Sequence, residues 1–505
     1  TFAPMRIVLA SPEAVPYAKT GGLADVATAL SKALAGAGHE VTLVLPFYPR
    51  SPAVQAAPPP LDAGRPIEIP VGGKRQPGRL LQTSLAGTGV RVVMVDQPVY
   101  FDRPGLYGEN GRDYPDNCER FVFFSRAVIE AVRVLELNPH VIHANDWQTG
   151  LLPAVFQIEC RWLPGFEETV VIYTIHNLAF QGQFWHWDME LTGLDWKYFN
   201  WRQMEHYGHL NLMKSGIVFS DAVTAVSPTY AREIQTKEFG CGLETVLAAH
   251  QKKLTGILNG VDTGEWNPRT DAFIARHYSV DDICSGRPHG KSACKADLQR
   301  RVGLPEHEGA LLVGMISRLT DQKGLDLLAV CGEDLLKHDL QLCFLGSGEA
   351  RYEQLVGELA ARHPDRVAAT IGFDEPLAHQ IEAGADAFLM PSQYEPCGLN
   401  QMYSQMYGTV PIVRRVGGLA DTVVDATPEN IAAGTATGFC FDKHEPSELV
   451  ATVERAARTF ADRQSWKSLV TAGMRQDWSW DRSARQYVEV YEQALARRGG
   501  AITKQ

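Results

Sequence analysis

The sequence predicts an α/β protein made of two Rossmann-like domains that face a deep interdomain cleft. Short apolar runs alternate with amphipathic stretches along both halves of the 505-residue chain, a pattern typical of parallel sheets covered by helices. The chain is too long for one hydrophobic core, which favours two domains. The phrase Gly-Gly-Leu-Ala-Asp occurs at residues 21–25 and again at 417–421, as expected of two similar halves.

The first half is predicted to alternate between strands and helices. Residues 6–10 form a short apolar strand, and residues 22–37 follow as a helix that ends near Gly36 and Gly38. Further strands are expected at 41–45, 90–95, 141–144 and 170–175, and a further helix at 118–135. Residues 51–78 are rich in proline and glycine, so we expect a surface excursion there rather than part of the core.

The second half repeats the alternation. Strands are expected at 311–316, 340–345, 367–371, 387–390 and 410–413, with helices at 325–337 and 349–362. A turn at 259–262 lies between the halves, so the predicted domains are residues 1–254 and 255–479. The apolar side of residues 480–498 predicts a last helix within a third segment, 480–505.

Composition argues against several functions. The formal net charge is −11 and no long basic run is present, so we expect no binding to nucleic acid or to an anionic membrane. No apolar stretch approaches the length of a membrane span. The nine cysteines form no C-x-x-C pair, which disfavours a zinc site or a disulfide framework and indicates a reducing compartment.

Each Gly-Gly phrase follows an apolar run and has a basic residue two positions before its first glycine. Glycines at the start of a helix let backbone N–H groups approach an anion, and the helix N-terminus favours negative charge. One copy alone could be an ordinary turn between a strand and a helix, but the repeated cation favours a phosphorylated ligand. The residues are Lys19, Gly21 and Gly22 in the first copy, and Arg415, Gly417 and Gly418 in the second.

A second pair of cations follows the strand predicted at 311–316. Arg318 and Lys323 share one loop, where arginine offers a planar fork to phosphate oxygens and lysine a compact charge. A solvated surface loop is the alternative. The Gly-x-Gly at 346–348 is weak evidence by itself, and Arg351 stands where a dinucleotide fingerprint needs its third glycine, which argues against NAD.

Other polar residues also follow predicted strands, at the edge where doubly wound sheets bind ligands. Asp146 follows one strand, and His176 with Asn177 follows another, so a site is favoured over a structural histidine. Glu395 precedes a predicted helix, where a carboxylate can grip sugar hydroxyls or merely suit the helix dipole. Residues 180–207 combine aromatic rings with amides, which suits sugar rings, although about half of these rings could instead pack into the domain.

Together these motifs resemble the bacterial glycogen synthase and plant starch synthase family. The resemblance spans nearly the whole chain, and its most specific parts are Lys-Thr-Gly-Gly-Leu at 19–23 and Glu-Pro-Cys-Gly-Leu at 395–399. It implies the GT-B type glycosyltransferase fold, with the last helix crossing back to the first domain. It also implies transfer of glucose from ADP-glucose to the non-reducing end of an α-1,4-glucan, with retention of configuration and no metal or other cofactor.

The resemblance further implies roles for individual residues. Arg318 and Lys323 would contact the donor phosphates, Glu395 would hold the transferred glucose, and His176 would line the sugar site; these are the implied catalytic residues. The aromatic stretch would belong to the acceptor side. The implied substrate- and nucleotide-binding residues are Lys19, Gly21, Gly22, Asp25, Tyr100, Asp146, Asn177, Asn259, Cys397, Gly398, Leu399, Gly417 and Gly418. Gln148, Asn400 and Val416 depart from the residues common in the family and put fine donor contacts in question.

Three alternatives stay open at this point. A dinucleotide-dependent oxidoreductase shares the fold class but is disfavoured by Arg351. A non-catalytic glucan-binding scaffold would need the aromatic stretch but neither the cations nor Glu395. UDP-glucose could replace ADP-glucose, because a fold does not determine the base. We also expect a cytoplasmic protein, or a plastid stroma protein if the source is a plant, that is a monomer or a small homo-oligomer.

Overall fold

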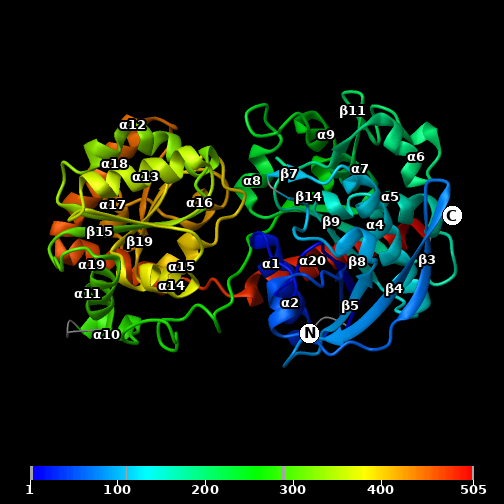
Figure 1. The fold of residues 1–505 in the computed structure, drawn as a ribbon, viewed down its shortest axis with the longest axis horizontal. Helices are drawn as coiled ribbons and strands as arrows, with labels where there is room; N and C mark the ends of the chain where they lie inside the picture. Colours follow the sequence, from blue (N-terminus) through cyan, green and yellow to red (C-terminus); the bar gives the residue numbers. More distant parts are fainter. Residues whose placement is uncertain (1–3, 110, 286–289, 503–505) are drawn as a thin grey trace. The chain divides into compact units, whose positions relative to one another are not determined.

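The computed structural model describes residues 4–109, 111–285 and 290–502. The chain divides into two compact units: Thr1–Gly260 with Trp480–Gln505, and Val261–Ser479 (Figure 1). The chain thus leaves the first unit after Gly260, a few residues beyond the boundary expected from the sequence, and returns to it at Trp480.

The main sheet of the first unit has nine strands. They are β1 (Arg6–Ala10), β2 (Glu40–Pro46), β3 (Arg65–Val71), β4 (Lys74–Ser84), β5 (Arg91–Asp96), β8 (Val141–Asn145), β9 (Val170–Ile175), β13 (Ala222–Ala225) and β14 (Leu254–Gly256). Their order is β14-β13-β9-β8-β1-β2-β5-β4-β3, and the strands from β14 to β5 are parallel. The strand order reverses between β1 and β8, which places a topological switch point there.

Helices cover this sheet. They are α1 (Gly22–Gly36), α2 (Pro52–Ala56), α3 (Pro98–Phe101), α4 (Asn117–Val134), α5 (Leu152–Val155), α6 (Met189–Thr192), α7 (Leu212–Phe219), α8 (Pro228–Glu233), α9 (Glu244–Ala249) and α20 (Trp480–Ile502). Two small sheets add β6 (Gly108–Glu109), β7 (Arg112–Asp113), β10 (Gln183–Phe184), β11 (Glu205–His206) and β12 (His209–Asn211).

The helix α20 is part of the core of the first unit although it follows the whole second unit in the sequence. It lies beside α1 (Figure 1), and Tyr487 and Tyr491 share one apolar cluster with Leu9 of β1 and Leu30 of α1. The hydroxyl of Tyr491 also lies 2.8 Å from Nδ1 of His143 on β8. The first unit therefore depends on residues from both ends of the described chain.

Residues 51–78 are not the surface excursion that the sequence predicts. They contain α2, β3 and the start of β4; β3 pairs antiparallel with β4, and β4 pairs antiparallel with β5. Ile67, Ile69 and Val71 are buried on one face of β3, whereas Pro66 and Pro70 point the other way and are exposed. Proline is tolerated because β3 is the edge strand. The sheet is consequently mixed rather than wholly parallel.

The second unit has a six-stranded parallel sheet in the order β17-β16-β15-β18-β19-β20. Its strands are β15 (Leu311–Ile316), β16 (Leu340–Gly346), β17 (Val367–Ile371), β18 (Ala387–Met390), β19 (Val410–Arg414) and β20 (Phe439–Phe441). This is the order of a dinucleotide-type doubly wound sheet, with its switch point between β15 and β18. Every strand predicted from the sequence in both units is present, with its ends within one residue of the expected ones.

Helices lie on both sides of the second sheet, for example α12 and α13 on one side and α14 and α15 on the other (Figure 1). The helices are α10 (Val280–Ser285), α11 (Gly290–Val302), α12 (Leu325–Leu335), α13 (Ala350–Arg362), α14 (Glu375–Gly384), α15 (Asn400–Met406), α16 (Gly417–Thr422), α17 (Pro428–Ala432), α18 (Pro446–Ala461) and α19 (Arg463–Met474). A single 3₁₀ turn, η6 (Asp321–Lys323), precedes α12.

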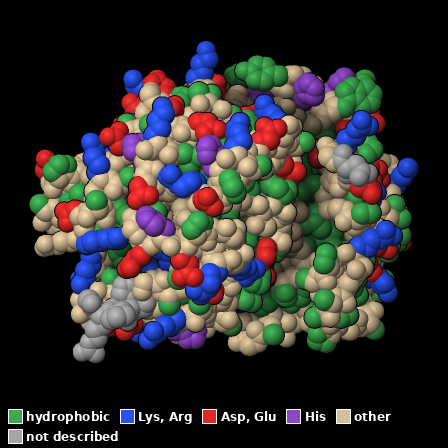
Figure 2. Space-filling view, turned by 60° about the vertical axis from the view of Figure 1, so that its left-hand side comes forward, with side chains coloured by type: hydrophobic (Ala, Val, Ile, Leu, Met, Phe, Trp, Pro, Cys, Tyr) green, Lys and Arg blue, Asp and Glu red, His purple; other side chains and the backbone are tan. Residues whose placement is uncertain are grey.

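Charges are mixed on the surface. On the face shown in Figure 2, lysine and arginine side chains alternate with aspartate and glutamate, and that face carries no continuous positive stripe of the kind that nucleic-acid sites use. In the described part of the chain, every helix is too short or too polar to cross a membrane.

Candidate active site

In the second unit, Lys323 and Glu395 meet at the switch point of the sheet. Lys323 comes from the loop after β15 and Glu395 from the loop after β18, and Lys323 Nζ lies 2.7 Å from Glu395 Oε2. The hydroxyl of Ser392 donates a hydrogen bond to the same carboxylate oxygen at 2.9 Å. Glu395 is only 5% exposed, so its carboxylate is held in one position by a cation and a hydroxyl.

A glycine allows these two loops to approach each other. Gly324 has φ +79°, and a Cβ atom at this position would lie 2.2 Å from the carbonyl oxygen of Pro391. The backbone N–H of Gln393 also donates to the carbonyl of Gln322 at 2.9 Å. Only glycine fits at position 324, and the resulting backbone contact brings Lys323 to Glu395.

Arg318, the other predicted phosphate-binding cation, lies earlier in the same loop. Its side chain is exposed, and Nη2 makes only a long contact of 3.4 Å with Oε1 of Gln322. Arg318 can therefore turn towards an anion without breaking a strong interaction.

The second Gly-Gly phrase is packed against the chain itself. A Cβ atom at Gly417 would lie 1.9 Å from the carbonyl oxygen of Glu395, and one at Gly418 would lie 1.9 Å from that of Cys397. The N–H of Gly418 donates to the carbonyl of Glu395 at 3.1 Å. The idea that Gly418 offers this N–H to a phosphate is therefore wrong; the two glycines let α16 pack closely on the Glu395 segment.

The first Gly-Gly phrase differs because it opens a long, accessible helix. Gly21 is extended and exposed, and no heavy atom of the described chain lies within 4 Å of a Cβ built on it. Lys19 and Asp25 flank it and form an exposed ion pair at 2.8 Å. The start of α1 is thus free for an anion, with Lys19 beside it.

A buried carboxylate that the sequence analysis missed holds this loop. Glu13 follows β1 and is 3% exposed, and it accepts hydrogen bonds from the backbone N–H of Thr20, from the Thr20 hydroxyl at 2.6 Å and from the Tyr107 hydroxyl. A single glutamate in a loop forms no sequence motif. The signal that could have identified Glu13 is its position shortly after β1, the strand at the switch point of the sheet.

His176 and Asp146 are brought together where β8 and β9 end. The backbone N–H of His176 donates to Asp146 Oδ1 at 2.7 Å, and that of Asn177 does so at 3.4 Å. Asp146 itself has φ +56°, a conformation that is strained for a residue with a side chain. Burial raises the pKa of Asp146 to about 7, although the two backbone hydrogen bonds act in the opposite direction.

The imidazole of His176 is held in one tautomer. Asn145 donates from Nδ2 to the carbonyl of Ala10 at 3.0 Å, so its Oδ1 accepts from Nε2–H of His176 at 2.9 Å. Burial lowers the pKa of His176 to about 3, which keeps the ring neutral at physiological pH. Nδ1 is therefore the ring nitrogen that carries a lone pair.

The remaining predicted residues lie outside these hydrogen-bonded groups. Tyr100 packs its ring on Phe123 in the core, and its hydroxyl donates to Glu119 at 2.6 Å. Asn259 is buried, and its Oδ1 has no hydrogen-bond partner in the described chain. The thiol-bearing Cys397 is buried too. Leu399 precedes α15 as its N-cap residue, and Gly398 before it has φ +70°.

One departure from the family pattern has a structural role. Nδ2 of Asn400, the first residue of α15, donates to the carbonyl of Ile316 at the end of β15 at 3.0 Å. This bond ties the helix after the Glu395 segment to the strand before the Lys323 loop. Val416 is buried as the N-cap residue of α16, and Gln148 is buried with no hydrogen-bond partner for Oε1 among the described residues.

Five rings of the aromatic stretch of the first unit are exposed, whereas Phe184, Tyr198 and Phe199 are partly buried. Phe184 contacts Trp147 and Tyr198 contacts Phe219, so the alternative of packing against the rest of the domain applies to part of the stretch. Trp201 is 70% exposed, and Trp185, Trp187 and Trp196 form a chain of edge-to-face contacts at centroid separations of 6.3 and 5.5 Å. None of the eight rings is buried: Phe184, Trp185, Trp187, Trp196, Tyr198, Phe199, Trp201 and Tyr207.

Comparison with known proteins decides the family. The first unit matches the model of the starch synthase catalytic domain over residues 6–249, and residues 299–468 match the model of glycosyl transferases group 1. A glycogen synthase of Anaeromyxobacter dehalogenans is 46% identical over 493 residues, which cover 96% of this chain and 99% of that protein. Glycogen synthase 1 of Methylococcus capsulatus is 44% identical, with 97% of each chain covered. The chain belongs to the glycogen synthase and starch synthase family.

A solved structure extends this result to the fold. The catalytic domain of starch synthase IV from Arabidopsis thaliana, bound to ADP and acarbose, matches with a TM-score of 0.87 and 32% identity over 98% of this chain and all of that one. A sucrose-phosphate synthase of Thermosynechococcus elongatus, 17% identical with a TM-score of 0.59, shares the fold alone. Membership in the family confirms the resemblance: the chain is a glycosyltransferase of the GT-B fold with glycogen or starch synthase function.

Packing at Gly418 gives the first prediction. We expect Gly418→Ala to displace the Glu395 segment, because its Cβ would meet the Cys397 carbonyl, and to lower kcat/KM by about 100-fold, as misplacements of about 1 Å do. Gly357→Ala in α13 is the control, since a Cβ there meets no atom within 4 Å in the described chain outside its own neighbours and helix backbone. Equal activity of the two variants in a glucose-transfer assay would contradict this role.

Burial of Asp146 gives the second prediction. Its pKa is about 7 in the folded protein against about 3.9 when unfolded. The folded state therefore binds more protons between these values, and the free energy of unfolding falls by up to about 4 kcal/mol as the pH rises from 4 to 7. Asp146→Asn keeps an acceptor oxygen and removes the titration. The stability difference between variant and wild type should grow over that range in urea titrations of the first unit; a difference independent of pH would refute the assignment.

Proposed function

We propose that this chain transfers glucose from ADP-glucose to the non-reducing end of an α-1,4-glucan, with retention of configuration and without a metal or other cofactor. The observation that carries the proposal is the contact of Lys323 with the buried Glu395 at the switch point of the second unit. The ADP and acarbose in the matched starch synthase IV structure support an ADP-linked donor and a glucan acceptor. We also propose a cytoplasmic enzyme that is a monomer or a small homo-oligomer.

The cations act on the leaving diphosphate. Lys323 and Arg318 stabilise the negative charge that grows on the phosphate oxygens as the bond to glucose breaks. Lys323 is engaged with Glu395 at 2.7 Å, while Arg318 is exposed and has no close partner among the described hydrogen bonds except the long one to Gln322. Lys19, at the open start of α1, adds a third cation. A chain of net charge −11 can bind an anion this way because the attraction is local.

Glu395 holds the transferred glucose by its hydroxyl groups rather than attacking it. Lys323 and Ser392 both engage Oε2 of its carboxylate, and no second carboxylate is paired with Glu395 in the sequence. We therefore favour front-face transfer, in which a leaving phosphate oxygen removes the proton of the acceptor hydroxyl. His176 stays neutral, so its ring or its backbone carbonyl can face the cationic sugar without electrostatic repulsion.

The exposed aromatic rings of residues 184–207 suit the acceptor. Sugar rings have an apolar face that stacks on indole and a hydroxyl edge that amides can bind. The chain of contacts among Trp185, Trp187 and Trp196 offers several such faces in succession. We therefore assign this surface of the first unit to the glucan.

The donor assay is the third prediction. Wild-type protein should transfer glucose to glycogen from ADP-glucose much faster than from UDP-glucose, and Lys323→Ala should lower kcat by at least about 100-fold, a loss expected when a charge that stabilises the transition state is removed. Lys337→Ala is the control, since this exposed lysine pairs with Asp334 in the same helix region. Preference for UDP-glucose would correct the donor, and no transfer from either would overturn the proposal.

The fourth prediction concerns the mechanism. With a slow donor analogue and no acceptor, intact-protein mass spectrometry should find no glucosyl adduct, because front-face transfer forms no covalent intermediate. Transfer by the wild type should meanwhile give an α-linked product by NMR. An adduct that appears in the wild type and is absent from Glu395→Gln would show that Glu395 is a nucleophile.

A further inference from the structure

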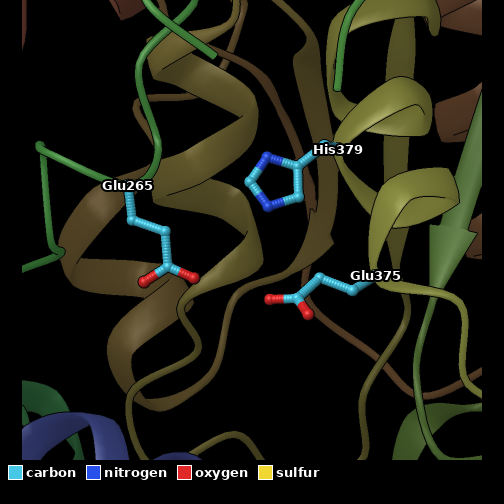
Figure 3. Close-up of side chains that lie close together, drawn as sticks. All are labelled: Glu265, Glu375 and His379. Carbon is cyan, nitrogen blue, oxygen red and sulfur yellow. The ribbon is translucent and has the colours of Figure 1, made fainter. Parts of the chain in front are cut away.

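A second cluster of titratable side chains lies in the second unit and includes neither Lys323 nor Glu395. Glu265, Glu375 and His379 bring one ligand atom each within 4.8 Å of one another (Figure 3). Glu375 and His379 are four residues apart on α14, so both side chains point to the same side of the helix. Glu265 comes from the loop that begins the second unit.

His379 is oriented as a ligand. Its ring is 1% exposed, and Nδ1 lies 2.7 Å from Oδ2 of Asp271, which also accepts a hydrogen bond from the Tyr407 hydroxyl. Nδ1–H thus donates a hydrogen bond to the Asp271 carboxylate, and in the neutral ring the lone pair is on Nε2. Metal-binding histidines usually donate their other ring N–H to a carboxylate in this way.

Nε2 of His379 is unsatisfied. It is buried and has no hydrogen-bond partner within the described part of the chain, a costly arrangement for a polar atom. The ring cannot easily turn away, because Trp266 stacks on it at a centroid distance of 3.9 Å and an angle of 5°. Nε2 therefore stays directed at the two carboxylates (Figure 3).

An ordinary role of Glu375 explains the cluster only in part. Glu375 occupies the first turn of α14, where negative charge suits the helix dipole. This role of Glu375 does not explain why the Glu265 carboxylate lies close by, or why a buried imidazole lone pair lies beside both. A cation between the three side chains would satisfy Nε2 and offset the repulsion of the two carboxylates at once.

We propose that Glu265, Glu375 and His379 bind a divalent ion of the zinc type. Imidazole together with carboxylates is a zinc donor set, whereas calcium and magnesium prefer oxygen ligands alone. Zinc ligands lie about 2.1 Å from the ion, so tetrahedral ligand atoms are about 3.4 Å apart. The two glutamates are exposed and the three ligand atoms lie within 4.8 Å of one another, so side-chain rotation can bring them to that separation, with water in the fourth position.

The ion would have a structural effect. It would join the first loop of the second unit to α14, and thereby hold Trp266 between His379 and Tyr403, on which it also stacks at 4.1 Å. None of the three cations that we assign to the donor phosphates belongs to the cluster. The site is therefore compatible with a sugar transfer that needs no metal.

Zinc binding to chelator-treated, full-length protein tests this proposal. Calorimetric titration with zinc chloride, checked by elemental analysis after gel filtration, should give one ion per chain in the wild type. A 100-fold excess over Kd should raise the unfolding midpoint of the second unit by roughly 5–10 °C. Glu265→Gln and Glu375→Gln, both exposed and isosteric, should each weaken binding at least about 10-fold.

A matched control separates this site from casual surface binding. Glu333 also lies beside a histidine, with a carboxylate oxygen 2.7 Å from Nε2 of His363, so Glu333→Gln should leave zinc affinity and the midpoint shift unchanged. Absence of a one-to-one zinc complex in the wild type would overturn the proposal. So would equal zinc binding by the Glu265→Gln/Glu375→Gln double variant, and neither readout depends on transfer activity.

Discussion

The ion pair between Lys323 and Glu395 constrains the loops that follow β15 and β18 in the second unit. A nearly buried carboxylate is unfavourable without a partner, so both loops must stay in register for the pair to exist. Gly324 permits one loop to touch the other, and Gly417 and Gly418 permit α16 to press on the Glu395 segment. The need to hold the Glu395 carboxylate in place explains why glycine stands at these three positions.

Much of the fold could be predicted because parallel strands are buried on both sides and read as continuous apolar runs. The hairpin of β3 and β4 could not, since Pro66 and Pro70 made its alternating pattern look like a loop, and only its edge position makes those prolines harmless. The repeated phrase is the clearest lesson. The same five residues open a long, accessible helix in one unit and a short, tightly packed helix in the other, because tertiary contacts with residues 395–397 decide the outcome.

The sequence could place residues that follow buried strands, such as His176 and Glu395, at the carboxyl ends of those strands, while their catalytic roles stay predictions. It could not identify residues whose role comes from a partner that is distant in sequence. Glu13 acts through Thr20 and Tyr107, and nothing local marks it. The Glu-x-x-x-His spacing of α14 is visible in the sequence, but the partner that orients His379 is Asp271, more than one hundred residues earlier.

The return of α20 to the first unit has a consequence for synthesis on the ribosome. Tyr487, Val488 and Tyr491 complete the apolar cluster that β1 and α1 begin. During synthesis, α20 is translated only after the contiguous second unit, Val261–Ser479. Until then, part of the apolar cluster of the first unit lacks its α20 residues, while the second unit can already fold. The first unit can therefore be completed only after the second has been translated, which is the reverse of the order in which their translation starts.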